Sequence, residues 1–294
     1  MSQNSSSASS RALVQTTIAR DLNDWCVHRF SLLAEQIRRS GQRLDPSFEV
    51  VSQDYPTDPS ERETLHQQLR DGYFGQVWLM APDLDNGPEP AFFEALEAAV
   101  GAGSHLIIAR DHTDLGSSLL NLSGRLEAVT RTQVFLRSSS EQPDPHEYVN
   151  LQCPGIETPC VITGQNGGVQ ICRKRAEHPL LQFQTLIPGH VVMPAHPHEG
   201  VITSTTPSQT ILLSSYSVRS GREQITAIID ETSTHGWVLH HSTFHHFADF
   251  NLDVSKGAPD FVLDPPSQQI KESPMLLQDL YSYLDAVVRY AIGG

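Results

Sequence analysis

Imidazole side chains are concentrated in the second half of this chain. Nine of its 14 histidines lie between positions 178 and 246. Neutral imidazole is a frequent metal ligand and general base, and here two clusters of it stand beside carboxylates. These clusters, together with an acidic segment earlier in the chain, predict metal binding or acid–base chemistry.

The earlier segment is RDHTDLG at positions 110–116, which follows the apolar run HLIIA. In open α/β sheets, side chains just beyond the carboxyl end of a strand face the ligand crevice. We therefore predict catalytic or orienting roles for Asp111, His112 and Asp114. In the alternative interpretation, Asp111 only caps the helix that follows.

The second segment, HPHEG at positions 196–200, places two imidazoles and a carboxylate within four residues. His196 and His198 would share one face of a strand, whereas Pro197 favours a loop, in which side chains can also converge. We predict His196, His198 and Glu199 as metal ligands. The alternative is an exposed polar turn.

The third segment, HHSTFHHFAD at positions 240–249, again follows an apolar run. A helix capped by Ser242 would place His245 and Asp249 four residues apart on one face, as helices present pairs of metal ligands. The predicted ligands here are His240, His241, His245, His246 and Asp249. Alternatively, individual imidazoles belong to the core and bind backbone carbonyls.

Zn²⁺ or Fe²⁺ suits imidazole and carboxylate ligands better than Mg²⁺ does. Such an ion lowers the pKa of bound water towards about 7, so the predicted function is metal-assisted hydrolysis of a small molecule. One alternative is metal-free acid–base catalysis by Asp111, His112 and a histidine of HSTFHH. Another is a non-catalytic ligand-binding or scaffold protein. A cysteine nucleophile is disfavoured, because no sharp strand-to-helix turn holds Cys153, Cys160 or Cys172.

Composition excludes several classes of partner. The 294 residues include 20 Lys+Arg and 34 Asp+Glu, a net charge of −14, which opposes nucleic-acid binding. No apolar run reaches about 18 residues, no signal-peptide pattern begins the chain, and the cysteines lack CxxC spacing. The glycine-rich GQNGG lacks the context of a phosphate cradle, so no nucleotide cofactor is indicated. We expect a cytoplasmic protein with a small-molecule ligand and no membrane partner; the oligomeric state has no readable signal.

Strand-like and helix-like patterns alternate around these segments. Residues 1–20 are expected to form a disordered Ser-rich tail, and 21–294 a single domain with a loop-rich insertion at about 138–175. The predicted helices are a segment from Asp21 that ends at Gly41, Pro59–Asp71, Pro90–Val100, a weak one at Leu115–Ala128, and Leu276–Ala291. The predicted strands are Phe48–Ser52, Gln76–Ala81, His105–Ala109, Ile211–Val218, Gln224–Asp230 and Gly236–His241. Strands that are apolar on both faces indicate a mostly parallel α/β sheet with helices on both faces and a partly antiparallel second half.

The order of these pieces resembles the class I glutamine amidotransferase-like superfamily, particularly its ThuA-like branch. The resemblance covers about residues 48–251 and rests on VWLMA, PAFFEALEAAV, HLIIA with RDHTDLG, HPLL and GWVLHHSTFHHFAD. It implies a flavodoxin-like sheet with a site at the carboxyl ends of the strands. The chain is also similar to bacterial proteins of unknown function that carry RDHxDLG, HPHEG and HSTFHHFAD patterns.

The sequence departs from the superfamily at its nucleophile. Glutaminases of this superfamily place a cysteine at the elbow after the strand, where this chain has Asp111 and His112. HPHE is similar to their His-Pro-Glu motif, but it lies too far from the C-terminus and lacks a cysteine partner. Glutamine hydrolysis through a thioester is therefore not expected.

Overall fold

The computed structural model describes residues 10–111, 115–122, 161–200, 202, 208–218, 221, 223–231 and 236–293. Its centre is one nine-stranded sheet in the order β2-β1-β3-β4-β9-β8-β7-β5-β6. The strands are β1 Arg11–Thr16, β2 Glu49–Gln53, β3 Gln76–Met80, β4 His105–Ala109, β5 Val169–Lys174, β6 His190–Pro194, β7 Gln209–Tyr216, β8 Glu223–Asp230 and β9 Val238–His241. The helices are α1 Ser31–Leu44, α2 Pro59–Arg70, α3 Pro90–Ala102, α5 Asp249–Leu252, α6 Gln269–Glu272 and α7 Gln278–Gly293.

The five strands from β2 to β9 are parallel, and the sheet continues from β9 to β6 through antiparallel pairs. This confirms the predicted α/β class with its partly antiparallel second half. Because the carboxyl ends of parallel strands lie at one edge, the segments that follow β4 and β9 are neighbours. The sheet therefore brings two of the three histidine- and aspartate-bearing segments together.

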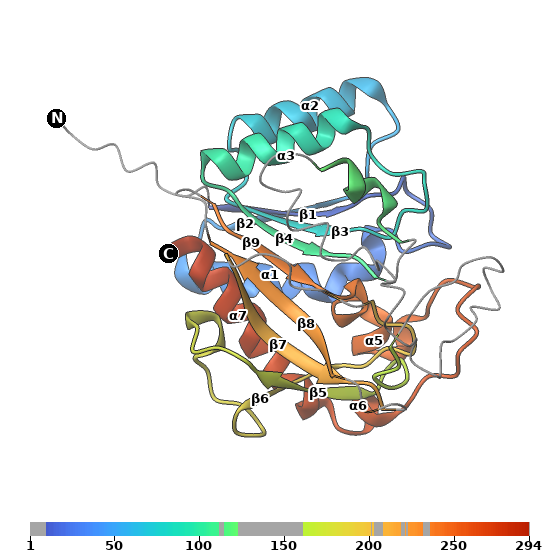
Figure 1. The fold of residues 1–294 in the computed structure, drawn as a ribbon. Coiled ribbons are helices and arrows are strands. Elements are labelled where there is room, and N and C mark those ends of the chain that lie inside the picture. Colours follow the sequence, from blue (N-terminus) through green and yellow to red (C-terminus); the bar gives the residue numbers. More distant parts are fainter. Residues whose placement is uncertain are drawn as a thin grey trace, which may run out of the picture.

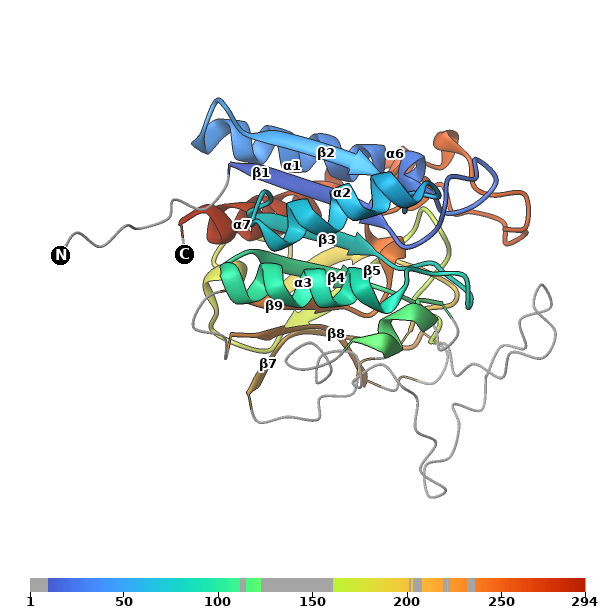
Figure 2. The ribbon, with the colours of Figure 1, turned by 90° about the horizontal axis from the view of Figure 1, so that it is seen from above.

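Helices cover both faces of the parallel half. In Figure 1, α2 and α3 lie on one face while α1 and α7 lie on the other. Side chains alternate along β3, so Trp78 joins the core beside α1 and α7, whereas Leu79 joins the core beneath α2 and α3. Seen from above in Figure 2, α2 and α3 run alongside the parallel strands. Burial on both faces explains why these strands are apolar throughout.

The helix predicted from Asp21 has different bounds in the structure. Its regular part begins at Ser31, after a 3₁₀ turn at Val27–Phe30, and continues through Gly41 to Leu44. Gly41 is not a stop signal, because a side chain at this position would overlap the Phe48 ring. This glycine lets β2 approach α1 closely.

Two further expectations about organisation are corrected. Arg11–Thr16, predicted to be part of a disordered tail, form the buried strand β1 between β2 and β3. Val169–Lys174, within the predicted loop-rich insertion, form β5. No pattern in the sequence predicted β6. Within the described residues, no helix has the length and apolar character to span a membrane.

Asp249 joins α1 to the segment after β9. Its buried carboxylate accepts hydrogen bonds from the Leu32 backbone N–H (2.8 Å) and the Ser31 hydroxyl (2.5 Å). The side chain therefore caps the N-terminus of α1 from a distant part of the chain, where a negative charge also complements the helix dipole.

We expect Asp249→Ala to lower the free energy of unfolding by about 1–3 kcal/mol, because it leaves a buried N–H without its acceptor. Asp249→Asn should lose less, since the amide oxygen can still cap the helix. Urea denaturation would measure both values. Equal stability of the alanine variant and the wild type would contradict this capping role.

Candidate functional site

Asp111 lies immediately after β4, and its carboxylate is buried. One of its oxygens, Oδ1, accepts a hydrogen bond from the Gly200 backbone N–H at 3.1 Å. This bond fixes the carboxylate with its other oxygen, Oδ2, facing two histidines. The neighbouring Arg110 is also buried, and its Nε donates to the Leu115 carbonyl across the turn (3.0 Å).

Gly200 is required where three segments meet. A Cβ at this position would lie 2.6 Å from the carbonyl oxygens of both Asp111 and Ser242. These are backbone atoms and cannot move aside as a flexible side chain could. The glycine of HPHEG therefore lets this loop approach the segments after β4 and β9.

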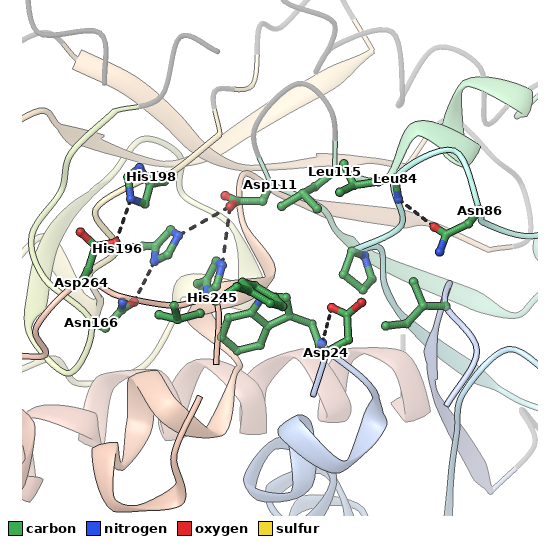
Figure 3. Close-up of a pocket in the computed structure, with 15 residues that line it drawn as sticks. Asp24, Leu84, Asn86, Asp111, Leu115, Asn166, His196, His198, His245 and Asp264 are labelled. Atoms are coloured by element: carbon green, nitrogen blue, oxygen red, sulfur yellow. Dashed lines mark hydrogen bonds and ion pairs between the residues drawn. The ribbon is translucent and has the colours of Figure 1, made fainter. Parts of the chain in front are cut away.

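His196 and His245 converge on Asp111 (Figure 3). Each Nε2 lies 3.6 Å from Oδ2 of Asp111, and both imidazoles are buried. Their rings are stacked, with centroids 3.5 Å apart and an interplanar angle of 16°. The three donor atoms all lie within 4.8 Å of one another. This is the one such group of three possible metal ligands among the residues described.

Two asparagines contact the opposite sides of the imidazole rings. Nδ1 of His196 lies 2.8 Å from Oδ1 of Asn166, and Nδ1 of His245 lies 3.3 Å from Oδ1 of Asn251. The Asn251 amide nitrogen donates to Asn166 Oδ1 (2.9 Å) and to the Ala195 carbonyl (3.0 Å), which fixes the orientation of its side chain. Amide oxygens accept hydrogen bonds, so each Nδ1 carries the proton and each Nε2 directs a lone pair at Asp111.

The other imidazole of HPHEG faces a different carboxylate. Nε2 of His198 lies 3.1 Å from Oδ2 of Asp264, and this pair is only partly buried. The rings of His198 and His196 are 5.7 Å apart in an edge-on arrangement. His198 therefore belongs to the wall of the site and lies outside the three-residue cluster.

Glu199 and His246 form a second buried network. Nε2 of His246 lies 3.1 Å from Oε1 of Glu199, and neither side chain is exposed. The carboxylate also accepts hydrogen bonds from Thr163 (2.9 Å), Gln170 (2.8 Å) and Ser242 (2.7 Å). These four contacts stabilise a buried charge and connect the HPHEG loop to β5 and β9.

His240 and His241 project to opposite faces of β9. His240 shares the α3 face with Val238, and His241 packs on the other face, where its Nε2 lies 3.0 Å from the Tyr283 hydroxyl. Burial, with smaller contributions from His246 and His240, lowers the pKa of His241 well below its ordinary value of 6.5. His241 is therefore a neutral core residue at pH 7.

The remaining predicted residues either cap a helix or lie outside the described parts of the chain. Asp249 caps α1 and does not share a face with His245, because short 3₁₀ and α segments replace the predicted continuous helix. His112 and Asp114 lie outside the described residues, as do Cys153 and Cys160.

Cys172 is fully buried on β5. Burial and the nearby Glu199 raise the pKa of its thiol well above 9.0, so the thiolate needed for nucleophilic attack is disfavoured.

A cavity of about 330 Å³ opens beside the cluster. Trp25 forms part of its wall, and its indole contacts the His245 imidazole edge-on at a centroid distance of 4.6 Å. The wall also includes residues that follow β1 and β3, which places the cavity at the carboxyl ends of the parallel strands. The full lining is Ile18, Asp24, Trp25, Pro82, Leu84, Asn86, Asp111, Leu115, Asn166, His196, His198, His245, Phe261, Val262 and Asp264.

Sequence reasoning missed the two asparagines. Asn166 lies in GQNGG, whose glycines suggest only a phosphate cradle, and Asn251 lies two residues after the third segment. A search for amide oxygens beside each histidine cluster could have nominated Asn251. The pairing with Asn166 depends on a contact between residues 85 positions apart.

Comparisons with known proteins found no matching family model and no matching curated sequence. Solved structures with a similar fold include the glutaminase domain of Trypanosoma brucei CTPS with bound acivicin (11% identity, 85% of this chain and 91% of that chain, TM-score 0.47). A putative ThuA-like protein from Bacteroides uniformis is similar at 13% identity (90% and 96%, TM-score 0.40). The mmIFT52 N-terminal domain is similar at 9% identity (96% and 98%, TM-score 0.48). The chemistry inferred for this chain therefore rests on its own site.

The lowered pKa of His241 predicts a pH-dependent stability. The unfolded chain takes up a proton below about pH 6.5 and the folded chain resists it, so stability is full above that pH and falls as the pH falls. His241→Gln should remove up to about 1.4 kcal/mol per pH unit from the slope between pH 6.5 and pH 5. Urea unfolding of both proteins across this range measures the difference, and identical slopes would contradict the assignment.

Proposed function

We propose that this protein is a divalent-metal enzyme that hydrolyses a small molecule, with Asp111, His196 and His245 as the metal ligands. The other predicted ligands then have supporting roles in the wall, the core or the cap of α1. The proposal rests on the chemistry of three side chains that meet at one point beside a cavity.

The observation that carries the proposal is the direction of the lone pairs. With protons on both Nδ1 atoms, two imidazole lone pairs and a carboxylate oxygen face one another at 3.6 Å. Three converging acceptors repel one another unless a cation lies between them. Metal-binding histidines commonly donate their other ring N–H to an oxygen, as these two do towards asparagine.

The spacing of these atoms also suits a metal. Zinc bonds of about 2.0–2.2 Å at tetrahedral angles separate neighbouring ligand atoms by about 3.3–3.5 Å. The nitrogen–oxygen distances of 3.6 Å need only a small contraction to reach this range. Two histidines and one carboxylate are a ligand set typical of zinc hydrolases and of non-haem Fe²⁺ sites.

A metal held by three protein ligands keeps a position for water or substrate. An ion in such a site supplies a water of lowered pKa and a Lewis acid for a carbonyl group. The chain's own contribution is to hold the ligands rigidly through the asparagines and Gly200. The indole of Trp25 and the neighbouring apolar walls exclude bulk water from one side.

We expect untagged protein incubated with Zn²⁺ and desalted to retain one equivalent, and His245→Ala to retain none. His198→Ala is the matched control, because it removes a nearby imidazole that faces Asp264 instead of Asp111. Elemental analysis measures the metal. At a free Zn²⁺ concentration about 100-fold above Kd, the wild type should gain about 2.7 kcal/mol of stability and His245→Ala should gain none.

Equal zinc retention by the wild type and His245→Ala would overturn the ligand assignment. Absence of retained metal in the wild type would favour the metal-free alternative, in which one of the two imidazoles is protonated beside Asp111 and acts in acid–base catalysis. Hydrolysis of p-nitrophenyl acetate, measured with and without chelator, provides the activity readout. The proposal expects the chelator to abolish it.

We expect Asn251→Leu to weaken zinc binding by about 10–100-fold, because it removes the acceptor that holds His245 in the required tautomer. Asn86→Leu is the matched control: its amide lies in the same cavity but contacts the Leu84 N–H. Competition with a fluorescent zinc chelator measures both affinities, with urea unfolding to confirm that each variant is folded. Unchanged affinity in Asn251→Leu would show that the asparagine does not orient the ligand.

A further inference from the structure

The cavity is at the small end of the range for ligand pockets. Its volume of about 330 Å³ compares with about 300–1,000 Å³ for typical small-molecule sites. Its described wall combines apolar side chains with three carboxylates, those of Asp24, Asp111 and Asp264. Within the described part of that wall there is no lysine or arginine. This composition favours a compact ligand that carries an apolar group and a positive charge.

Two of the three carboxylates have an imidazole beside them. Asp111 faces His196 and His245, and Asp264 faces His198 at 3.1 Å. Asp24 differs, because it accepts a hydrogen bond from the Trp25 backbone N–H (2.7 Å), and no cationic side chain in the described structure contacts it. In Figure 3 it lies apart from the histidine cluster, in the same cavity.

The surroundings of Asp24 disfavour its negative charge. Partial burial raises the pKa of this carboxyl above its ordinary value, and the nearby Asp21 raises it further. A carboxylate that is desolvated and lacks a cationic partner has a free-energy cost, which a cation of the ligand would offset. Trp25 adds an aromatic ring to the same wall, and aromatic rings also attract cations.

We propose that the cavity binds a small amine with an apolar body, and that Asp24 is the specificity-determining residue that pairs with its ammonium group. This substrate class rests on the proposed function for the reaction that follows binding. The charge recognition itself depends on Asp24 alone. A cation held there would present the rest of the molecule to the Asp111–His196–His245 cluster.

Calorimetric titration of chelator-treated protein with benzylamine, benzyl alcohol and benzoate tests the recognition without metal. These probes share a ring and differ in charge. We expect benzylamine to bind at least tenfold more tightly than the other two. Asp24→Asn should weaken benzylamine binding by at least tenfold and leave benzyl alcohol nearly unchanged. Glu94→Gln, an exposed position on α3, is the control for the loss of one negative charge.

The proposal is overturned if benzylamine shows no measurable binding, if benzoate or benzyl alcohol binds equally well, or if Asp24→Asn keeps the preference. Zinc retention by the same proteins separates this inference from the proposed function. Metal retention without amine preference contradicts the inference alone. Amine preference that is lost in Asp24→Asn, in a wild type that retains no zinc, contradicts the proposed function alone.

Discussion

The close approach of three chain segments at Gly200 is the constraint on which the site depends. The loop after β6, the turn after β4 and the segment after β9 meet where a single methyl group would collide with two carbonyl oxygens. The same glycine donates its N–H to Asp111 and so orients the carboxylate towards His196 and His245. Backbone contact, rather than side-chain packing, therefore sets the distance between the proposed ligands.

Rigid support around this point has two sources. The parallel strands place the ends of β4 and β9 side by side, and their burial between two helical layers prevents them from shifting. The Asn166–Asn251 pair and the Glu199–His246 network then connect the loops across the site. Buried polar groups that satisfy one another in this way fix a single arrangement of side chains. A preorganised ligand set is the expected consequence.

The histidines of this chain differ in role because they differ in partners. His196 and His245 have amide oxygens on one side and a carboxylate on the other, so a nitrogen lone pair is directed at Asp111. His241 has a tyrosine hydroxyl and an apolar surrounding, which keep it neutral within the core. His246 contacts a buried glutamate that four groups share. Identical side chains thus serve ligation, packing and charge compensation within one layer of the protein.

The sequence by itself determined the strands and helices of the parallel half, since double-sided apolar runs and the Asp58–Pro59 cap are local signals. It also located the segments of the site, because polar residues follow apolar strands at one edge. It missed β1, whose six residues follow a Ser-rich stretch and include Gln15 and Thr16. Only the tertiary structure decided which of the predicted residues meet. That choice depends on the face each loop presents and on contacts such as Asn166 with Asn251, which join residues far apart in the sequence and leave no local pattern.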